Sequence, residues 1–438
     1  MTHGRVRAVR RLVWADPLDV ATGISARDGA LCLLSDPAAS GSRSFVAAQP
    51  DLWRTLDLAD GGLFDPLRAP GMGAGVIGLA SYDAGARTAT GARAPVWPDL
   101  ILARYPAMLV FDHDAGALHA VGWGETGASA DAACDGAATW LASARRPTVP
   151  EAPATAFEAE ASPQAYLDAV AQVRERIAAG DLFQANVARA WGGVLGHEAD
   201  PFEVFVRLTA GTKHAPTAPY GAFWRMGDRA LVSNSPELFL ACDRATGRIE
   251  TRPIKGTRPR RSDPVEDAAE VTDLLASAKD RAENLMIVDL MRNDLARVSA
   301  PGSVAVDRLF EIESHAAVHH LVSTISGRLA PGQGPAEVLE ATFPPGSITG
   351  APKHQAMKLI GTLEPPRGPW CGSLFVLDEA GDLTASVLIR TASFERTGGV
   401  WRFRTLAGAG IVADSEPQAE LAETEAKISA VRRALYGA

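Results

Sequence analysis

The sequence predicts a large globular protein that combines strands and helices, built either as two or three domains or as one large α/β unit with an appended piece. Of its 438 residues, 47% are apolar and 22% are charged, which supplies ample material for a hydrophobic core. The first 145 residues contain mainly short strand-like runs, whereas longer apolar periodicities typical of helices follow later in the chain. A segment rich in alanine, proline and glutamate separates the two regions.

The overall charge and the cysteines exclude some classes of protein. The formal net charge is −9, whereas nucleic-acid-binding proteins normally present a basic face, so we expect no nucleic-acid partner. No apolar run approaches the ~20 residues of a membrane span, and no signal-peptide core follows the basic start, so we expect a cytoplasmic protein without membrane contact. The four cysteines form no C-x-x-C pair, which argues against a zinc site and fits a reducing compartment.

The composition divides the chain into an N-terminal domain (1–145), a linker (146–161) and a C-terminal domain (162–438). In the first of these, residues 30–34 predict a buried strand, and residues 106–112 and 118–123 predict two strands paired around a turn. The C-terminal domain begins with a predicted helix, because Ser162 is a good helix cap and Pro163 suits the first helical position. Gly180 ends that helix, and residues 182–189 predict a strand.

A second predicted strand of this domain, residues 231–240, is interrupted by Pro236. A proline inside a strand is unusual, and it suggests that the neighbouring Glu237 is directed at something. An exposed glutamate on an edge strand explains the pattern equally well.

Two predicted helices carry pairs of carboxylates. In the helical region 265–298, Asp280 and Glu283 are three residues apart and share a face. The closing helix, 417–436, carries Glu420, Glu423 and Lys427 away from its apolar stripe. Together the two pairs could hold a divalent cation with oxygen ligands and leave positions for a substrate carboxylate and water. Each pair by itself is commonly only a solvated helix face.

The most informative stretch is RPIKGTRP, residues 252–259. The proline stiffens the approach to Lys255, and Gly256 allows a sharp turn or a close contact with a ligand. Cationic neighbours and partial burial lower the proton affinity of a lysine, which makes it a usable nucleophile. A surface lysine in a polar loop is the alternative.

Further candidates lie in the last third of the chain. Three glycine-bearing loops, at 346–353, 367–372 and 407–412, could present backbone N–H groups to an anion, although none has P-loop spacing. Arg390 lies in an apolar strand pattern, and because an unpaired arginine there is costly, we expect a carboxylate partner for it. His320 lies among apolar residues, where a histidine usually has a structural role.

The ordered set of these motifs resembles the chorismate-utilising enzymes, a family that includes anthranilate, aminodeoxychorismate, isochorismate and salicylate synthases. The resemblance covers residue 162 to the C-terminus, and it is carried by GDLFQAN (180–186), SPE (235–237), RPIKGTR (252–258), KDRAEN (279–284), HLVS (320–323), GSITGAPK (346–353) and GAGIV (408–412). It implies an α+β fold with two stacked, largely antiparallel β-sheets, helices outside and the substrate deep between the sheets. The N-terminal region resembles the additional domain of the anthranilate and aminodeoxychorismate branch.

Two positions point to one branch of this family. By resemblance, lysine in PIKGT belongs to the aminodeoxychorismate branch, whereas anthranilate synthases carry alanine at the place of Lys255. Isochorismate and salicylate synthases have a water-activating lysine at the place of Gln184, which cannot take a proton. The resemblance therefore implies amination of chorismate at C4 to 4-amino-4-deoxychorismate, a transferase reaction of p-aminobenzoate and folate biosynthesis. The alternatives are anthranilate synthase component I and a non-catalytic scaffold that binds chorismate or a glutaminase.

The resemblance also implies roles for individual residues. Lys255 is expected to be the nucleophile that adds at C2, and Glu237 the general acid for the departing 4-hydroxyl, with His320 near that leaving group. Glu283 and Glu423 are expected to bind Mg²⁺, with Asp280 and Glu420 supporting through water. The expected contacts to the substrate carboxylates come from Arg390, Thr349, Lys427 and the backbone at Gly408 and Gly410.

Ammonia is expected from a separate partner. No cysteine has the glycine-flanked elbow context of an amidotransferase nucleophile, so a glutamine amidotransferase subunit or free ammonium should supply it. Trp370 departs from the family pattern, which more often has tyrosine there. Residues 34–36 match the tryptophan-binding segment of anthranilate synthases only loosely, which argues against feedback inhibition by tryptophan.

Overall fold

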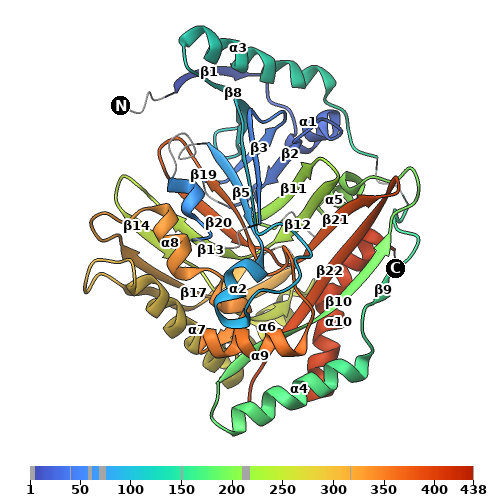
Figure 1. Ribbon diagram of the computed structural model, residues 1–438, viewed down its shortest axis with the longest axis vertical. Coiled ribbons are helices and arrows are strands. Elements are labelled where there is room, and N and C mark those ends of the chain that lie inside the picture. The colour runs from blue at the N-terminus through green and yellow to red at the C-terminus, as the bar shows by residue number, and fades with distance from the viewer. Residues whose placement is uncertain are drawn as a thin grey trace.

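The described part of the computed structural model, residues 5–39, 41–57, 62–68, 75–148, 151–209, 218–315 and 317–437, forms two β-sheets with helices around them (Figure 1). Within these ranges every paired strand is antiparallel to its neighbour. The expected α+β class with two antiparallel sheets is therefore confirmed.

The first sheet has 12 strands in the described residues, in the order β1-β8-β7-β3-β2-β11-β12-β21-β22-β10-β18, with β9 beside β10. Its strands are β1 (Val6–Leu12), β2 (Leu31–Leu34), β3 (Arg43–Ala47), β7 (Ala107–Asp112), β8 (Ala117–Gly124), β9 (Glu158–Ala159), β10 (Gln184–Val194), β11 (Tyr220–Met226), β12 (Arg229–Ser235), β18 (Gly350–Ala351), β21 (Thr391–Thr397) and β22 (Val400–Ile411).

The second sheet has 10 strands in the described residues, in the order β15-β17-β14-β13-β20-β19-β5-β6-β4, with β16 beside β17. Its strands are β4 (Leu52–Leu56), β5 (Val76–Ala80), β6 (Leu100–Arg104), β13 (Leu238–Cys242), β14 (Arg248–Thr251), β15 (Ile254–Pro259), β16 (Ala305–Ser314), β17 (Val318–Arg328), β19 (Ser373–Leu377) and β20 (Leu383–Val387).

Helices lie around the two sheets (Figure 1), with α3 over β1 and β8 at one end, and α6, α7 and α9 toward the other. The helices are α1 (Pro17–Ile24), α2 (Tyr82–Thr90), α3 (Gly127–Ala138), α4 (Pro163–Ala178), α5 (Pro201–Thr209), α6 (Pro264–Ala276), α7 (Ala278–Ala296), α8 (Pro335–Thr342), α9 (Lys353–Leu363) and α10 (Pro417–Leu435), with short 3₁₀ turns η1 (Asp65–Arg68), η2 (Thr139–Ser143) and η3 (Gly346–Ile348). None of the helices in the described ranges is both long and apolar enough to cross a membrane.

Local sequence signals explain where several helices begin. The Ser162 side chain accepts a hydrogen bond from the Ala165 N–H at the start of α4, which confirms the predicted cap. The region predicted as helical from 265 to 298 is two helices rather than one, because the chain leaves the helical conformation at Ser277. The Ser277 N–H closes α6, and its side chain caps α7 by accepting from the Asp280 N–H. This restart fixes the direction in which Asp280 and Glu283 leave α7.

Both sheets take strands from both sides of the expected linker. In the first sheet β2 pairs with β11, and in the second β5 pairs with β19. The linker itself contacts the C-terminal region, because Ala154 bridges to Leu195 and β9 pairs with β10. The division into two domains stays a prediction, but the sheets that carry the site are common to both regions.

The junction between β5 and β19 depends on a glycine. Gly78 lies directly opposite Phe375, whose buried ring covers the Gly78 Cα; a Cβ at this position would lie 2.0 Å from the ring. Since real Cβ atoms do not approach other atoms so closely, any side chain at Gly78 would push the Phe375 ring out of the core.

We expect Gly78→Ala to lower the free energy of unfolding by about 1–3 kcal/mol, the usual cost of overpacking. Chemical denaturation followed by circular dichroism measures this change. Gly136→Ala is the matched control, because Gly136 lies in α3 with open space around its Cα, and alanine there favours the helix. Equal stability of Gly78→Ala and the native protein would contradict the close packing.

Candidate active site

The strand break at Pro236 is the point where the chain passes from one sheet to the other. β12 belongs to the first sheet and β13 to the second, so Glu237 lies in the crossover between them. The residue is 4% exposed, which places a carboxyl group in the space between the sheets. The interpretation that the break directs Glu237 inward is therefore correct, and the exposed edge strand is excluded.

Burial raises the pKa of the Glu237 carboxyl to about 7. A hydrogen bond from the Ser347 hydroxyl, the nearby Lys255 ammonium and the Ile254 N–H oppose this effect but do not cancel it. A carboxyl group that titrates near neutral pH can hold a proton and release it to a leaving group, which is what a general acid requires.

Lys255 enters the same space from β15 of the second sheet. The neighbouring Gly256 has a φ of +93°, a conformation that other residues rarely adopt. Burial lowers the pKa of the Lys255 amine, the Glu283 carboxylate opposes this shift, and the Lys427 ammonium adds to it. The amine therefore loses its proton more easily than a surface lysine, which favours a nucleophilic role over the solvated alternative.

Gly410 and Gln184 of the first sheet lie close to this amine. A Cβ on Gly410 would be 3.4 Å from the Lys255 Nζ and 3.2 Å from the Gln184 Nε2, so a hydrogen at this position leaves room for both. Gln184 is fully buried, and neither its amide oxygen nor its amide nitrogen has a hydrogen-bond partner among the described residues. Buried polar groups are normally paired, so the amide marks a place for a polar ligand.

Lys427 approaches from α10. Its Nζ donates a hydrogen bond to the Gly408 carbonyl at 2.9 Å and forms an ion pair with Glu423 at 2.6 Å. Asn186 and Trp370 pack tightly against Gly408, since a Cβ at this position would be 2.5 Å from the Asn186 Oδ1 and 3.1 Å from the Trp370 ring. The Lys427 side chain and the Trp370 ring thus both lie against Gly408, on the same strand as Gly410.

The predicted metal ligands come from two helices, α7 and α10, that one lysine side chain connects. The Lys279 ammonium lies 3.9 Å from Glu283 of α7 and 3.5 Å from Glu420 of α10, so it bridges the two helices. Burial raises the pKa of Glu283, although Lys255 and Lys279 lower it in part. Burial also acts to raise the pKa of Glu423, but Lys427, Lys279 and Lys255 together outweigh this effect and the net shift is downward. Asp280 pairs instead with Arg258, at 3.1 Å.

The described residues contain no cluster of three or more histidine, cysteine, aspartate or glutamate side chains that could hold a metal ion. Mg²⁺ usually needs only one or two protein carboxylates, because waters and substrate oxygens fill its other positions. Glu283 and Glu423 both act on Lys255 and on each other, so they face the same space as the predicted nucleophile. Two partly exposed carboxylates, each paired with a lysine side chain, fit such a Mg²⁺ site.

His320 lies on β17, the strand beside β15, and Arg390 lies near it. The His320 Nδ1 is 2.9 Å from the Thr257 hydroxyl, and burial, with Arg390 and His315 nearby, lowers the pKa of the imidazole to about 3. His320 is therefore neutral at physiological pH. Arg390 has a φ of +51° between β20 and β21, and in the described ranges no ion pair or hydrogen bond holds its guanidinium. The expected carboxylate partner of Arg390 is thus absent from these residues, and the strand prediction at this position is wrong.

Thr349 is completely buried in the loop before α9, where its hydroxyl donates to the Pro345 carbonyl at 2.7 Å. Its donor is therefore used within the loop, and its oxygen lone pairs are what it can offer a ligand. The same loop carries Ser347, the partner of Glu237.

Three contributors to the site were missed from the sequence. Ser347 holds Glu237, and Lys279 bridges the carboxylates. Arg367 donates to Glu364, to the Asn186 carbonyl and to the Ile348 carbonyl, and it stacks 5.1 Å from Trp370. Ser347 and Arg367 belong to glycine-bearing loops that the sequence did single out. Lys279 stands in the KDRAEN motif, and only its position between two helices reveals its role.

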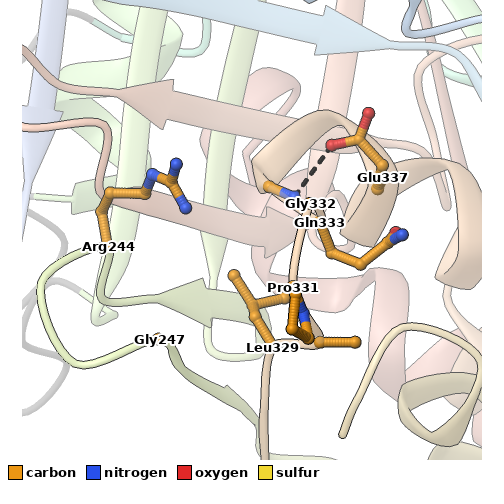
Figure 2. A pocket seen from close by; sticks show the side chains of 9 residues that line it. Arg244, Gly247, Leu329, Pro331, Gly332, Gln333 and Glu337 are labelled. Carbon is orange, nitrogen blue, oxygen red and sulfur yellow. Dashed lines mark hydrogen bonds between the residues drawn. The ribbon is translucent and has the colours of Figure 1, made fainter.

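A separate depression on the protein surface contains none of these residues (Figure 2). It is lined by the turn at Arg244 and Gly247 and by the segment from Leu329 to Glu337. The Glu337 carboxylate there accepts a hydrogen bond from the Gly334 N–H, an ordinary contact at a helix start, and forms an ion pair with Arg68. The residues that line this depression include no nucleophilic side chain and no acid whose pKa is shifted toward neutral.

Comparison with known proteins agrees with the arrangement between the sheets. Residues 29–433 match the sequence profile of the chorismate binding enzymes. The chain belongs to this family. Aminodeoxychorismate synthase component 1 of Salmonella typhimurium is 40% identical over 363 residues, which is 82% of this chain and 76% of that protein. Anthranilate synthase component 1 of Haloferax volcanii is 41% identical over 281 residues, which is 63% of this chain and 52% of that protein.

The fold of this chorismate-binding enzyme has a counterpart among solved structures. Anthranilate synthase component I from Streptococcus pneumoniae superimposes with a TM-score of 0.75 and 26% sequence identity, covering 90% of this chain and 93% of the other. The expected anthranilate synthase-like fold is thereby confirmed, and the match extends well beyond the C-terminal region that carries the motifs.

Proposed function

We propose that this chorismate-binding enzyme aminates chorismate at C4 and forms 4-amino-4-deoxychorismate, a step of p-aminobenzoate and folate biosynthesis. The observation that carries the proposal is the amine of the partly buried Lys255, which lies near Glu237 and next to the unpartnered amide of Gln184. The similarity to aminodeoxychorismate synthase component 1, which extends over most of the chain, supports the same reaction.

In the first half of the reaction the neutral Lys255 amine forms a bond to C2 of chorismate. The two ring double bonds shift, and the bond between C4 and its hydroxyl oxygen breaks. Glu237 gives its proton to this oxygen, which leaves as water. Dividing the substitution into two steps with a covalent intermediate lowers the barrier that a poor leaving group imposes.

In the second half ammonia forms a bond to C4 and the double bonds shift back. The bond between C2 and the Lys255 nitrogen breaks, and the Glu237 carboxylate takes the proton that the new ammonium group gives up. Lys255 is neutral and Glu237 is protonated again. Gln184 is buried beside the amine and remains uncharged, so it can orient a nitrogen nucleophile without activating water.

The other residues hold the substrate. Arg390, whose guanidinium has no protein partner among the described residues, is suited to a substrate carboxylate, as are Lys427 and the backbone at Gly408 and Gly410. The neutral His320 can exchange a hydrogen bond near the departing hydroxyl without adding charge. Glu283 and Glu423 would bind Mg²⁺, with Glu420 and Asp280 behind them. When bound, Mg²⁺ neutralises the ring carboxylate and fixes its position.

The proposal includes a glutamine amidotransferase subunit as the source of ammonia. Its support is the designation "component 1" of the Salmonella relative and the lack of an amidotransferase-like cysteine, since Cys32, Cys134, Cys242 and Cys371 are all buried. We also propose a cytoplasmic location, which fits four unpaired thiols.

Anthranilate synthesis is the second candidate function. The similarity to the Haloferax protein favours it, and the presence of Lys255 opposes it.

A product assay tests the reaction. We expect the purified protein to convert chorismate, Mg²⁺ and ammonium into 4-amino-4-deoxychorismate, identified by mass and chromatography. Lys255→Ala should lose at least about a hundredfold of this rate, because it removes the nucleophile. Lys358→Ala, a change at an exposed lysine of α9, is the control. If the products are anthranilate and pyruvate, the enzyme is an anthranilate synthase and the proposal is wrong. If the native protein turns over no chorismate, only a binding role is left.

The rate should depend on pH through Glu237. Only the protonated carboxyl can donate to the leaving hydroxyl, so kcat/KM should fall as the pH rises through about 7. Ser347→Ala should shift this fall to higher pH, because the lost hydrogen bond favoured the carboxylate form. Ser429→Ala, at an exposed hydroxyl bonded only within α10, should leave the profile in place. A profile unmoved by Ser347→Ala would argue against Glu237 as the acid.

The metal site is tested by titration. Removal of Mg²⁺ with a chelator should abolish turnover, and Glu283→Gln should raise the Mg²⁺ concentration for half-maximal rate by about tenfold or more, since one carboxylate ligand is lost. Asp289→Asn, an exposed change on the same helix, is the control. Turnover that survives chelation, or an unchanged Mg²⁺ requirement in Glu283→Gln, would contradict the assignment.

A further inference from the structure

The loop between α8 and α9, residues 343–352, delivers Ser347 to Glu237. Residues 343–351 are all buried, and Gly346 packs so tightly on Leu290 and Met291 of α7 that a Cβ would lie 2.3 Å from the Met291 methyl group. A buried loop must satisfy its backbone groups internally, so its shape depends on specific anchors.

Lys353 is the anchor that the reaction scheme does not use. Its Nζ donates to the Thr342 carbonyl at 2.7 Å and to the Asp294 carboxylate at 2.5 Å. Thr342 is the last residue of α8 and Lys353 the first of α9, so one ammonium group ties the two ends of the loop together. Asp294 fixes that group to α7, the helix that also carries Glu283.

Burying this ion pair costs free energy, because both charged groups lose contact with water. The Lys353 and Asp294 side chains are 14% and 6% exposed, and a buried ion pair often adds no more stability than apolar residues of the same size. Its particular benefit is geometric: the ammonium can bond a carboxylate and a carbonyl at once, which an apolar side chain cannot do. The α8 carboxyl end, where backbone carbonyls lack helical partners, is the place where such a donor is needed.

The rest of the loop transmits this anchor toward the site. The Thr349 carbonyl accepts from the Asn186 N–H, and the Ala351 carbonyl from the Phe183 N–H, so the second half of the loop is held by the first sheet. Arg367 holds the Ile348 carbonyl at 3.2 Å. Among the described residues, Ser347 and the residues before it have no such sheet partners. This first half is held by the packing of Gly346 on α7, by the Thr349 bond to the Pro345 carbonyl and, at its start, by the Lys353 contact to Thr342.

We propose that Lys353 and Asp294 form a clamp that closes the 343–352 loop and positions the Ser347 hydroxyl on Glu237. Lys353 is thus a positioning residue for the general acid. The inference rests on the proposed function, because Glu237 is the acid only in that reaction.

A double-mutant cycle tests the clamp. Lys353→Met/Asp294→Asn removes both charges together, so no buried charge is left without a partner. With chorismate and ammonium we expect kcat to fall about tenfold in the native background, the effect of losing one hydrogen bond to a charged group. In the Ser347→Ala background the same change should cost less than about twofold, because the group that the clamp positions is already gone. Asp307→Asn, which breaks a surface ion pair with Arg248, is the control and should leave kcat unchanged in both backgrounds.

Two further measurements keep the test independent of folding and of turnover. Amide hydrogen exchange of residues 343–352, measured without substrate, should speed up in the double variant and not in the Asp307 control. Lys353→Arg keeps the positive charge and the hydrogen-bond donors. It should therefore retain most of the native kcat and the slow amide exchange of the native loop.

Equal losses of kcat in both backgrounds, or exchange of the loop at the native rate, would overturn the clamp. No amination of chorismate by the native protein would instead overturn the proposed function, while the exchange experiment would still report on the loop. The two failures are therefore distinguishable.

Discussion

The site depends on one constraint: the space between the two sheets holds several ionisable groups that are largely removed from water. Glu237 lies where the chain crosses from one sheet to the other, and Lys255 reaches it from an edge of the second sheet. Burial shifts each group toward its neutral form, and each is close enough to the other to limit that shift. The Glu237 carboxyl group and the Lys255 amine are therefore both held in their neutral forms more easily than exposed side chains of the same type, which suits an acid and a nucleophile.

The surrounding charges follow from this constraint. Lys279 bridges carboxylates of α7 and α10, and Lys427 occupies Glu423 while it holds the Gly408 carbonyl. These lysines balance acidic groups near the starts of α7 and α10 that would otherwise repel each other. A cation and a dianionic substrate would enter a site whose opposite charges are already paired, so binding exchanges one set of ion pairs for another.

The sequence predicted most of what belongs to short motifs. The capped start of α4, the strand break at Pro236 and the unusual lysine in RPIKGTR are local signals, and each marks a feature that the structure contains. Ser277 was not recognised as the end of one helix and the start of another, because its hydrogen bonds to both become evident only in three dimensions. Arg390 was expected to meet a carboxylate, but sequence cannot distinguish an arginine paired within the protein from one that faces a place for an anion. The Lys353 contacts to Asp294 and Thr342 join residues 59 and 11 positions away, which no periodicity reveals.

The shared sheets have a consequence for how the protein is made. As the chain emerges during synthesis, β1, β8, β7, β3 and β2 can associate early, and so can β4, β6 and β5. Their inner edges, β2 and β5, then lack partners, and β5 gains β19 only after nearly 300 further residues have been added. At ordinary rates of translation this takes roughly 15–60 s, during which the edge of β5 stays open to association with other chains, whereas the edge of β2 is covered earlier, once β11 has been made. The architecture that places an acid and an amine between two sheets thus leaves the nascent protein dependent on protection of those edges.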